Sequence, residues 1–157
     1  ERTREVLDEN PEDEDLRRTL RLGRIDGEVE FRDVTFGYTP DKPVLHSISF
    51  LASPGTLTAL VGSSGSGKST IISLLAAFHS PQVGEVLVDG ADLSEVRLDT
   101  YRSQLGVVLQ DSFLFDGPIR ENIAFSRPQP SEGQLLEACR IARVDVCAEV
   151  LEVRYYT

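Results

Sequence analysis

Glycines and hydroxyl side chains surround a single lysine at residues 62–70, and this run constrains the fold more than any other feature. It reads Gly62-Ser63-Ser64-Gly65-Ser66-Gly67-Lys68-Ser69-Thr70. The run fits GxxxxGK[ST] with no mismatch, and it lies between apolar segments at 56–61 and 71–78. A strand that enters such a loop and a helix that leaves it direct backbone N–H groups and the positive helix end toward an anion. The sequence therefore predicts a loop that binds nucleotide phosphates.

The residue types of this loop suit that chemistry individually. The glycines let the backbone adopt positive φ and bring its N–H groups against phosphate oxygens. Lys68 supplies a mobile ammonium for the β- and γ-phosphates, and the Ser69 hydroxyl is placed to bind Mg²⁺. A flexible Gly/Ser-rich turn is the alternative, but such a turn needs neither the strand before it nor the helix after it. We therefore expect a nucleotide and Mg²⁺ as ligands.

Charge and composition exclude several other classes of function. The net charge is −10 and the sequence pI is about 4.6, so electrostatic attraction to nucleic acid or anionic lipid is not expected. Cys139 and Cys147 form no CxxC pair, and no nearby histidines complete a metal set. The most apolar stretch, at 71–78, is too short to cross a bilayer.

The chain divides into a charged N-terminal linker and an α/β domain. Residues 1–27 contain an acidic run followed by several arginines, and we interpret them as a solvated linker. In residues 28–157, strands are expected at 28–36, 48–51, 56–61, 85–88 and 105–109, and helices at 69–78, 119–125 and 131–144. The apolar parity shifts between Phe31 and Val34, which predicts a bulge. A small antiparallel sheet is expected beside part of a parallel sheet that carries the loop.

Further motifs flank the loop in the order and spacing of a known family. They are Phe36-Gly37-Tyr38 and Pro43-Val44-Leu45 upstream, and Gly106-Val107-Val108-Leu109-Gln110-Asp111, Phe113-Leu114-Phe115 and Ile119-Arg120-Glu121-Asn122-Ile123 downstream. Together they resemble the nucleotide-binding domain of an ABC transporter of the exporter type, from about Glu28 to Val146. The resemblance implies a partial P-loop NTPase (RecA-like) core with an antiparallel β-subdomain, at the cytoplasmic face of a membrane.

The resemblance also implies roles for single residues. Tyr38 matches the aromatic residue that stacks on adenine, and Val44 joins residues 62–70 in the ATP site. Gln110 matches the glutamine that reaches Mg²⁺ and the attacking water, so Ser69 and Gln110 are the implied metal ligands. Phe113–Phe115 match an apolar contact with the transporter's membrane domain, and a second nucleotide-binding domain is the other implied partner. Residues 1–27 then correspond to the linker from a preceding membrane domain, which would explain the absence of methionine.

Several motifs of the family do not occur in these residues. The LSGGQ-type signature, the Walker B strand with its catalytic base, and the switch histidine are missing. We therefore expect an incomplete central sheet, and a polypeptide that binds MgATP without hydrolysing it. Pro118 also replaces the hydroxyl residue usual before Ile119. The alternative is a self-contained P-loop kinase or GTPase that uses Asp89 as its Walker B acid, although Asp89-Gly90 is also a plain turn signal.

Overall fold

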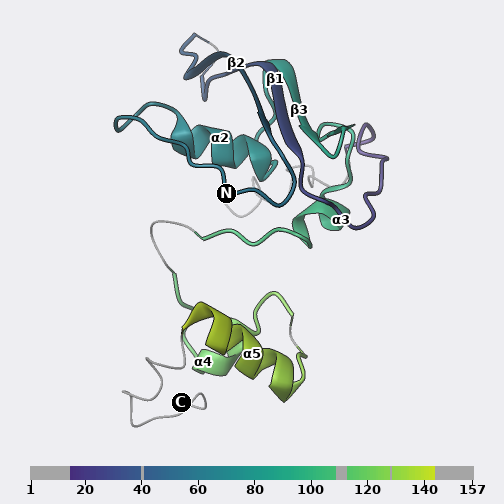
Figure 1. Cartoon of the computed structure of the whole chain (residues 1–157), viewed down its shortest axis with the longest axis vertical. Coiled ribbons are helices and arrows are strands. Elements are labelled where there is room, and N and C mark those ends of the chain that lie inside the picture. The colour runs from purple at the N-terminus through teal and green to yellow at the C-terminus, as the bar shows by residue number, and fades with distance from the viewer. Residues whose placement is uncertain (1–14, 40, 109–112, 128, 144–157) are drawn as a thin grey trace, which may run out of the picture. The chain divides into compact units, whose positions relative to one another are not determined.

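A computed structural model describes residues 15–39, 41–108, 113–127 and 129–143 of the chain (Figure 1). The chain forms two compact units, residues 1–106 and 107–157. The described part of the first unit contains a β-sheet, the glycine-rich loop and two helices, and that of the second contains two short helices.

The sheet of the first unit is antiparallel throughout. Its strands are β1 (Val29–Phe36), β2 (Leu45–Ala52), β3 (Val83–Val88) and β4 (Ala91–Asp92), in the spatial order β2-β1-β3-β4. β1 lies between β2 and β3 and pairs with both (Figure 1). The predicted antiparallel β-subdomain is therefore confirmed, with strands longer than the sequence pattern indicated at β2 and β3.

β1 contains a bulge that turns its large side chains to one face. Asp33 has a φ of 46°, and the pairing with β2 shifts register between Phe31 and Val34. Without the bulge, the odd spacing of these two residues would point them to opposite faces of the sheet. Instead Phe31, Val34 and Phe36 are all buried in one core cluster. The bulge predicted from the parity shift is confirmed.

The helix α2 (Lys68–Leu75) follows the glycine-rich loop, as predicted. Its Leu74 is buried and belongs to the same core cluster as Phe31 of the sheet. The helix ends before Phe78, where the apolar pattern placed its end. The reason is that Ala77 takes a φ of 56°, a left-handed conformation that a regular α-helix cannot include.

The helix α3 (Leu98–Arg102) caps the C-terminal end of α2. The Tyr101 hydroxyl donates to the carbonyl oxygen of Leu75 at 2.8 Å, and the Arg102 guanidinium donates to the next two carbonyls at 3.2 and 2.8 Å. The last carbonyls of a helix have no partner within it, so these donors satisfy them. Burial raises the pKa of Tyr101 to about 12, so its hydroxyl remains a donor even in moderately alkaline solution.

Residues 18–28 form hydrogen bonds with residues 89–104, which include β4 and α3. Leu20 forms an isolated parallel β-bridge there. Its N–H donates to the Glu95 carbonyl oxygen at 2.9 Å, and its carbonyl oxygen accepts from the Arg97 N–H at 2.8 Å. The Arg18 guanidinium donates to the carbonyl of Leu93 at 2.6 Å, and the Leu22 N–H donates to a threonine hydroxyl in α3 at 3.2 Å. This part of the predicted linker is thus attached to the first unit, while the boundary at residue 27 stays a prediction.

The second unit contains α4 (Ile119–Ile123) and α5 (Glu132–Ala142), at the two positions predicted to be helical. Ser131 begins α5 with a capping box, in which its hydroxyl accepts from the Gln134 N–H and the Gln134 side chain accepts from the Ser131 N–H. Cys139 is buried on α5, as expected for a small apolar residue of a helix. Cys147 lies outside the described residues.

Two predicted strands, at 56–61 and 105–109, do not form in the described residues, and these predictions were wrong. No described segment pairs with 56–61 or 105–108, and Leu57 and Val108 are 100% and 97% exposed. An apolar run becomes a strand only when neighbouring strands satisfy its backbone and cover its side chains. The parallel sheet expected around the loop is therefore absent from the described part of the chain.

We expect Gly84→Ala in β3 to destabilise the protein more than Gly90→Ala in the turn after it. Both glycines have positive φ, +84° and +78°, so alanine suffers similar backbone strain at each. A Cβ at Gly84 would also collide with the Arg32 carbonyl oxygen and lie 2.6 Å from the Asp33 carbonyl carbon, whereas Gly90 has nothing within 4 Å. Overpacking of this kind costs about 1–3 kcal/mol. Urea unfolding followed by circular dichroism measures the difference, and equal losses would contradict the β1–β3 geometry.

Candidate phosphate-binding site

Gly67 fixes the junction between the loop and α2. It is the N-cap of the helix, with a φ of 88°, and it is buried. A Cβ at this position would lie 2.6 Å from Leu45 Cδ2 and 3.5 Å from Val44 Cγ1. Only glycine combines this backbone conformation with so close an approach. The start of β2 therefore packs directly against the loop, and Val44 lies beside it.

The Lys68 side chain folds back into the loop that precedes it. Its ammonium donates to the carbonyl oxygens of Gly62 at 3.0 Å and Ser63 at 2.7 Å, and to the Ser66 hydroxyl at 3.2 Å. A backbone hydrogen bond also holds the loop, because the Ser66 N–H donates to the Ser63 carbonyl oxygen at 3.3 Å. An ammonium has three donors, so these neutral acceptors account for all of them. The cation is held where the chain turns into the helix.

The N-terminal end of α2 is open to an anion. Its N-cap provides no side-chain acceptor, and its first turn contains no acidic residue. The first N–H groups of a helix have no acceptor within the helix and form the positive end of its dipole. Ser63, Ser64, Ser66 and Ser69 are exposed around this end, and Gly65 adopts a φ of 79° at the tip of the loop. The arrangement suits an anion with several oxygens.

Thr70 differs from the other hydroxyl residues because it is buried and points away from solvent. Its hydroxyl shares a hydrogen bond of 3.2 Å with the Tyr38 hydroxyl. The sequence motifs predicted both residues for the site but not this contact. Tyr38 itself remains 58% exposed. The structure therefore brings the predicted aromatic residue to the first turn of the loop's helix.

Two residues near Tyr38 were not predicted for the site. The Gln82 side-chain amide forms two hydrogen bonds with the backbone of Gly37. It accepts from the Gly37 N–H at 2.8 Å and donates to the Gly37 carbonyl oxygen at 2.7 Å. His79 contacts the Tyr38 ring edge to face, with 5.4 Å between centroids. Neither residue lies in a motif, and both come close to Tyr38 only through the folding of segments far apart in the sequence. His79 stands where a tyrosine is common in the family that the sequence resembles, and from the sequence it is interpreted as a helix-end histidine without a catalytic role; nothing in the sequence indicates its contact with Tyr38.

Ser69 is the one implied metal ligand that the structure describes. It is exposed in the first turn of α2, while Gln110 lies outside the described residues. The described part of the chain contains no group of three His, Cys, Asp or Glu side chains that could hold a metal ion. Mg²⁺ in nucleotide sites takes one or two protein oxygens and completes its shell with phosphate and water. An exposed hydroxyl next to an anion site fits this requirement.

The Asp89 carboxylate binds backbone N–H groups that precede β1, and none of them belongs to the glycine-rich loop. It accepts from the N–H groups of Asp26 at 2.7 Å, Gly27 at 3.0 Å and Glu28 at 2.8 Å. Asp89 and Gly90 have φ of 50° and 78° and form the turn between β3 and β4. The turn interpretation is confirmed. The carboxylate is already occupied by three donors, which argues against its use as a Walker B acid.

The second unit exposes a group of aromatic side chains, which we call the aromatic patch: Phe113, Phe115 and Phe125. Phe115 lies between the other two, edge to face with Phe113 at 5.1 Å and stacked on Phe125 at 4.4 Å. Asn122 holds this loop, because its side chain accepts from the Phe115 N–H at 2.7 Å and donates to the Phe115 carbonyl at 3.0 Å. Phe113 and Phe125 are largely exposed, and Phe115 is about half exposed. Phe125 is a member that the sequence motifs did not indicate.

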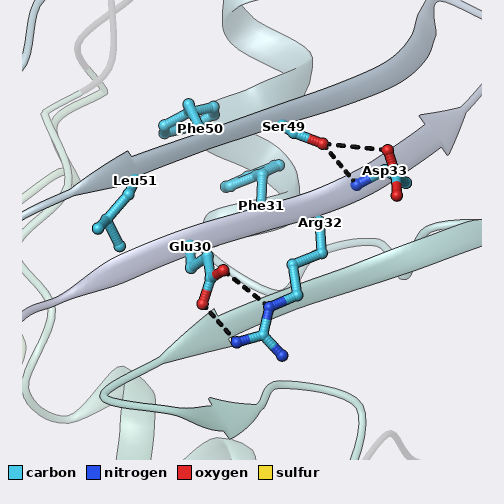
Figure 2. A pocket seen from close by; sticks show the side chains of 7 residues that line it. All are labelled: Glu30, Phe31, Arg32, Asp33, Ser49, Phe50 and Leu51. Carbon is cyan, nitrogen blue, oxygen red and sulfur yellow. Dashed lines mark hydrogen bonds and ion pairs between the residues drawn. The ribbon is translucent and has the colours of Figure 1, made fainter.

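A separate hollow lies over β1 and β2, with a volume of about 390 Å³ (Figure 2). It is lined by Glu30, Phe31, Arg32, Asp33, Ser49, Phe50 and Leu51. Its polar groups are paired with one another, as Figure 2 shows for Glu30 with Arg32 and for Asp33 with Ser49. The hydrogen bonds from Arg32 hold the pKa of Glu30 below its usual value. No lining residue belongs to the glycine-rich loop, so the hollow is not part of the predicted site.

Comparison with known proteins gives a consistent result. The family described as ABC transporter matches residues 45–153. A fatty acid ABC transporter ATP-binding/permease protein of Mycobacterium bovis is 41% identical over 160 residues, which cover all of this chain and 25% of that protein. The mycobactin import ATP-binding/permease protein IrtB of Mycolicibacterium smegmatis is 50% identical over 117 residues, covering 74% of this chain and 20% of its own length. The chain thus spans about a quarter or less of these relatives.

A solved structure supports the same fold. It is described as a bacterial Atm1-family ABC exporter with ATP bound, and it superimposes with a TM-score of 0.89 at 36% sequence identity. The match covers 99% of this chain and 28% of that one. The predicted fold class, a partial P-loop NTPase core with an antiparallel β-subdomain, is confirmed. Among the described residues, no helix has both the length and the apolar character needed to span a membrane.

We expect Asp89→Ala to lower the free energy of unfolding and to leave ATP affinity unchanged. The substitution removes the two carboxylate oxygens that accept from three backbone N–H groups, and at this exposed position the loss is worth about 1–2 kcal/mol. Glu95→Ala removes the same charge from the same region and serves as the control. Urea unfolding and calorimetric titration with MgATP give the two readouts. A loss of ATP affinity specific to Asp89→Ala would restore Asp89 as a ligand of the nucleotide site.

Proposed function

We propose that this chain, which belongs to the ABC transporter family, is the portion of a transporter ATPase domain that binds MgATP. The observation that carries the proposal is the Lys68 ammonium held by three neutral oxygens beside the uncapped end of α2. Phosphate oxygens are charged and compete well against neutral carbonyls for an ammonium. The loop therefore places a cation at a helix end suited to an anion, and no carboxylate among the residues that the structure describes pairs with it.

In this proposal each predicted residue has a distinct task. Lys68 binds the β- and γ-phosphates, and the N–H groups and hydroxyls of residues 62–70 bind the remaining phosphate oxygens. Ser69 and Gln110 hold Mg²⁺, which neutralises phosphate charge. Tyr38 stacks on adenine, and Val44, packed beside Gly67, provides an apolar contact next to the loop. The exposure of Tyr38 and its bond to Thr70 support this assignment, because they leave an aromatic surface available close to the loop.

The partners proposed for this domain are a transporter membrane domain and a second nucleotide-binding domain. The aromatic patch, formed by Phe113, Phe115 and Phe125, supports the first contact, since exposed apolar groups of this kind mark interaction sites. The proposed location is the cytoplasmic face of a membrane, reached through that membrane domain. The names of the relatives, which join ATP-binding and permease functions in one protein, support this arrangement.

The polypeptide is proposed to bind ATP without turning it over on its own. Phosphoryl transfer also needs a group that orients and polarises water, and donors that stabilise the departing charge. The family motifs that supply these functions do not occur in the 157 residues. A self-contained kinase or GTPase would need an acid after β3, and the Asp89 carboxylate already binds three backbone N–H groups.

We expect Lys68→Ala to weaken ATP binding by about 1.5–3 kcal/mol, the usual worth of hydrogen bonds to a charged group. Lys42→Ala is the matched control, because Lys42 is the only other lysine and lies in a turn outside the loop. Calorimetric titration of MgATP into each variant measures the effect. If both variants bind ATP as tightly as the unchanged chain, the loop is not the nucleotide site.

We expect no steady-state release of phosphate from MgATP by the purified 157-residue chain. The physical reason is the missing water-orienting and charge-stabilising groups, and a phosphate-release assay provides the measurement. If turnover does appear, the variants Lys68→Ala and Asp89→Asn test whether it depends on the phosphate loop and on the Asp89 carboxylate. Magnesium-dependent turnover abolished by both substitutions would favour the kinase or GTPase alternative and overturn the proposal of binding alone.

A further inference from the structure

Three aromatic side chains meet where the segment after β1 contacts the segment after α2. Phe36 comes from the end of β1, Tyr38 from the segment after it, and His79 from the segment after α2. Tyr38 makes edge-to-face contacts with both of the others, at 5.2 Å and 82° with Phe36 and at 5.4 Å and 87° with His79. His79 also packs on Phe36 at 5.4 Å. These separations lie within the range in which aromatic pairs attract one another.

The contacts restrain the Tyr38 ring while leaving much of it accessible. The hydroxyl is bonded to Thr70 at 3.2 Å, and the ring contacts Phe36 and His79, yet 58% of the residue remains exposed. A side chain this exposed would otherwise sample several rotamers. Phe36 is buried in the core and so provides a fixed support. His79 is exposed, and it is the one member of the group that contacts Tyr38 without belonging to the core or to the loop.

We infer that His79 is a positioning residue that holds the Tyr38 ring in the orientation in which it stacks on a purine base. This inference rests on the proposed function, in which Tyr38 contacts adenine. Ordering a mobile side chain on binding reduces affinity, so a ring already held in place binds the base more tightly. Stacking uses the face of the base and none of its hydrogen-bonding edges. The effect therefore applies to ATP and GTP alike, and not to a ligand without a base.

Calorimetric titrations of the full chain with MgATP and with magnesium tripolyphosphate test the inference. We expect His79→Ala to weaken ATP binding about two- to fivefold, and His79→Phe, which keeps a ring at this position, to stay within about twofold. Tripolyphosphate affinity should be equal in all three proteins. In a Tyr38→Ala background, itself weakened about three- to tenfold for ATP, His79→Ala should add no further loss.

The outcomes separate this inference from the function on which it rests. If Tyr38→Ala weakens ATP binding and His79→Ala does not, the positioning role is overturned and the proposed function stands. If His79→Ala weakens tripolyphosphate as much as ATP, His79 acts on the loop and the inference is wrong. If neither Lys68→Ala nor Tyr38→Ala changes ATP affinity, the proposed function itself fails.

A second measurement needs no ligand. The chain contains no tryptophan, so Tyr38→Trp introduces a single reporter at the position in question. The fluorescence anisotropy of this tryptophan should fall when His79→Ala is added, because the ring gains freedom of motion, and should be retained with His79→Phe. Equal anisotropy in all three proteins would show that His79 does not restrain the ring.

Discussion

The fixing of α2 at both ends is the constraint on which the rest of the first unit depends. At one end the Lys68 ammonium joins the helix to the loop before it, and Gly67 packs against β2. At the other end Tyr101 and Arg102 satisfy the last carbonyls from α3. Because unsatisfied carbonyls at a buried helix end are costly, the donors from α3 stabilise the C-terminal end, while Lys68 and Gly67 fix the N-terminal end and leave its N–H groups open. The position of the anion site follows from these attachments.

The β-subdomain connects the loop to the aromatic residue proposed to bind the base. The bulge in β1 places Phe31, Val34 and Phe36 in one core, and this core also contains Leu74 of α2. Tyr38 lies two residues after the end of β1. The residue before it, Gly37, is held by two hydrogen bonds between its backbone and the Gln82 side chain. The phosphate and base contacts are therefore built on one packed unit, although they come from distant parts of the sequence.

An apolar composition is not enough to make a strand, as the exposed apolar segments show. Residues 56–61 have the composition of a buried strand, and a strand was predicted there from that composition alone. Strand formation also needs partners, which no described segment provides, and Leu57 and Val61 are exposed as a result. The helix end at Leu75 was misplaced for a related reason, since it depends on α3 and on the conformation of Ala77. Neither effect is contained in the local sequence.

The sequence by itself determined the features that a few neighbouring residues control. These include the phosphate loop with its lysine, the bulge between Phe31 and Val34, the turn at Asp89 and the capped start of α5. Such features follow from backbone conformations and hydrogen bonds over short separations. Only the tertiary structure decided the contacts of Tyr38 with Thr70 and His79, and the use of the Asp89 carboxylate by the backbone of residues 26–28. Those contacts join distant segments, and their geometry exists only after the core has brought the segments together.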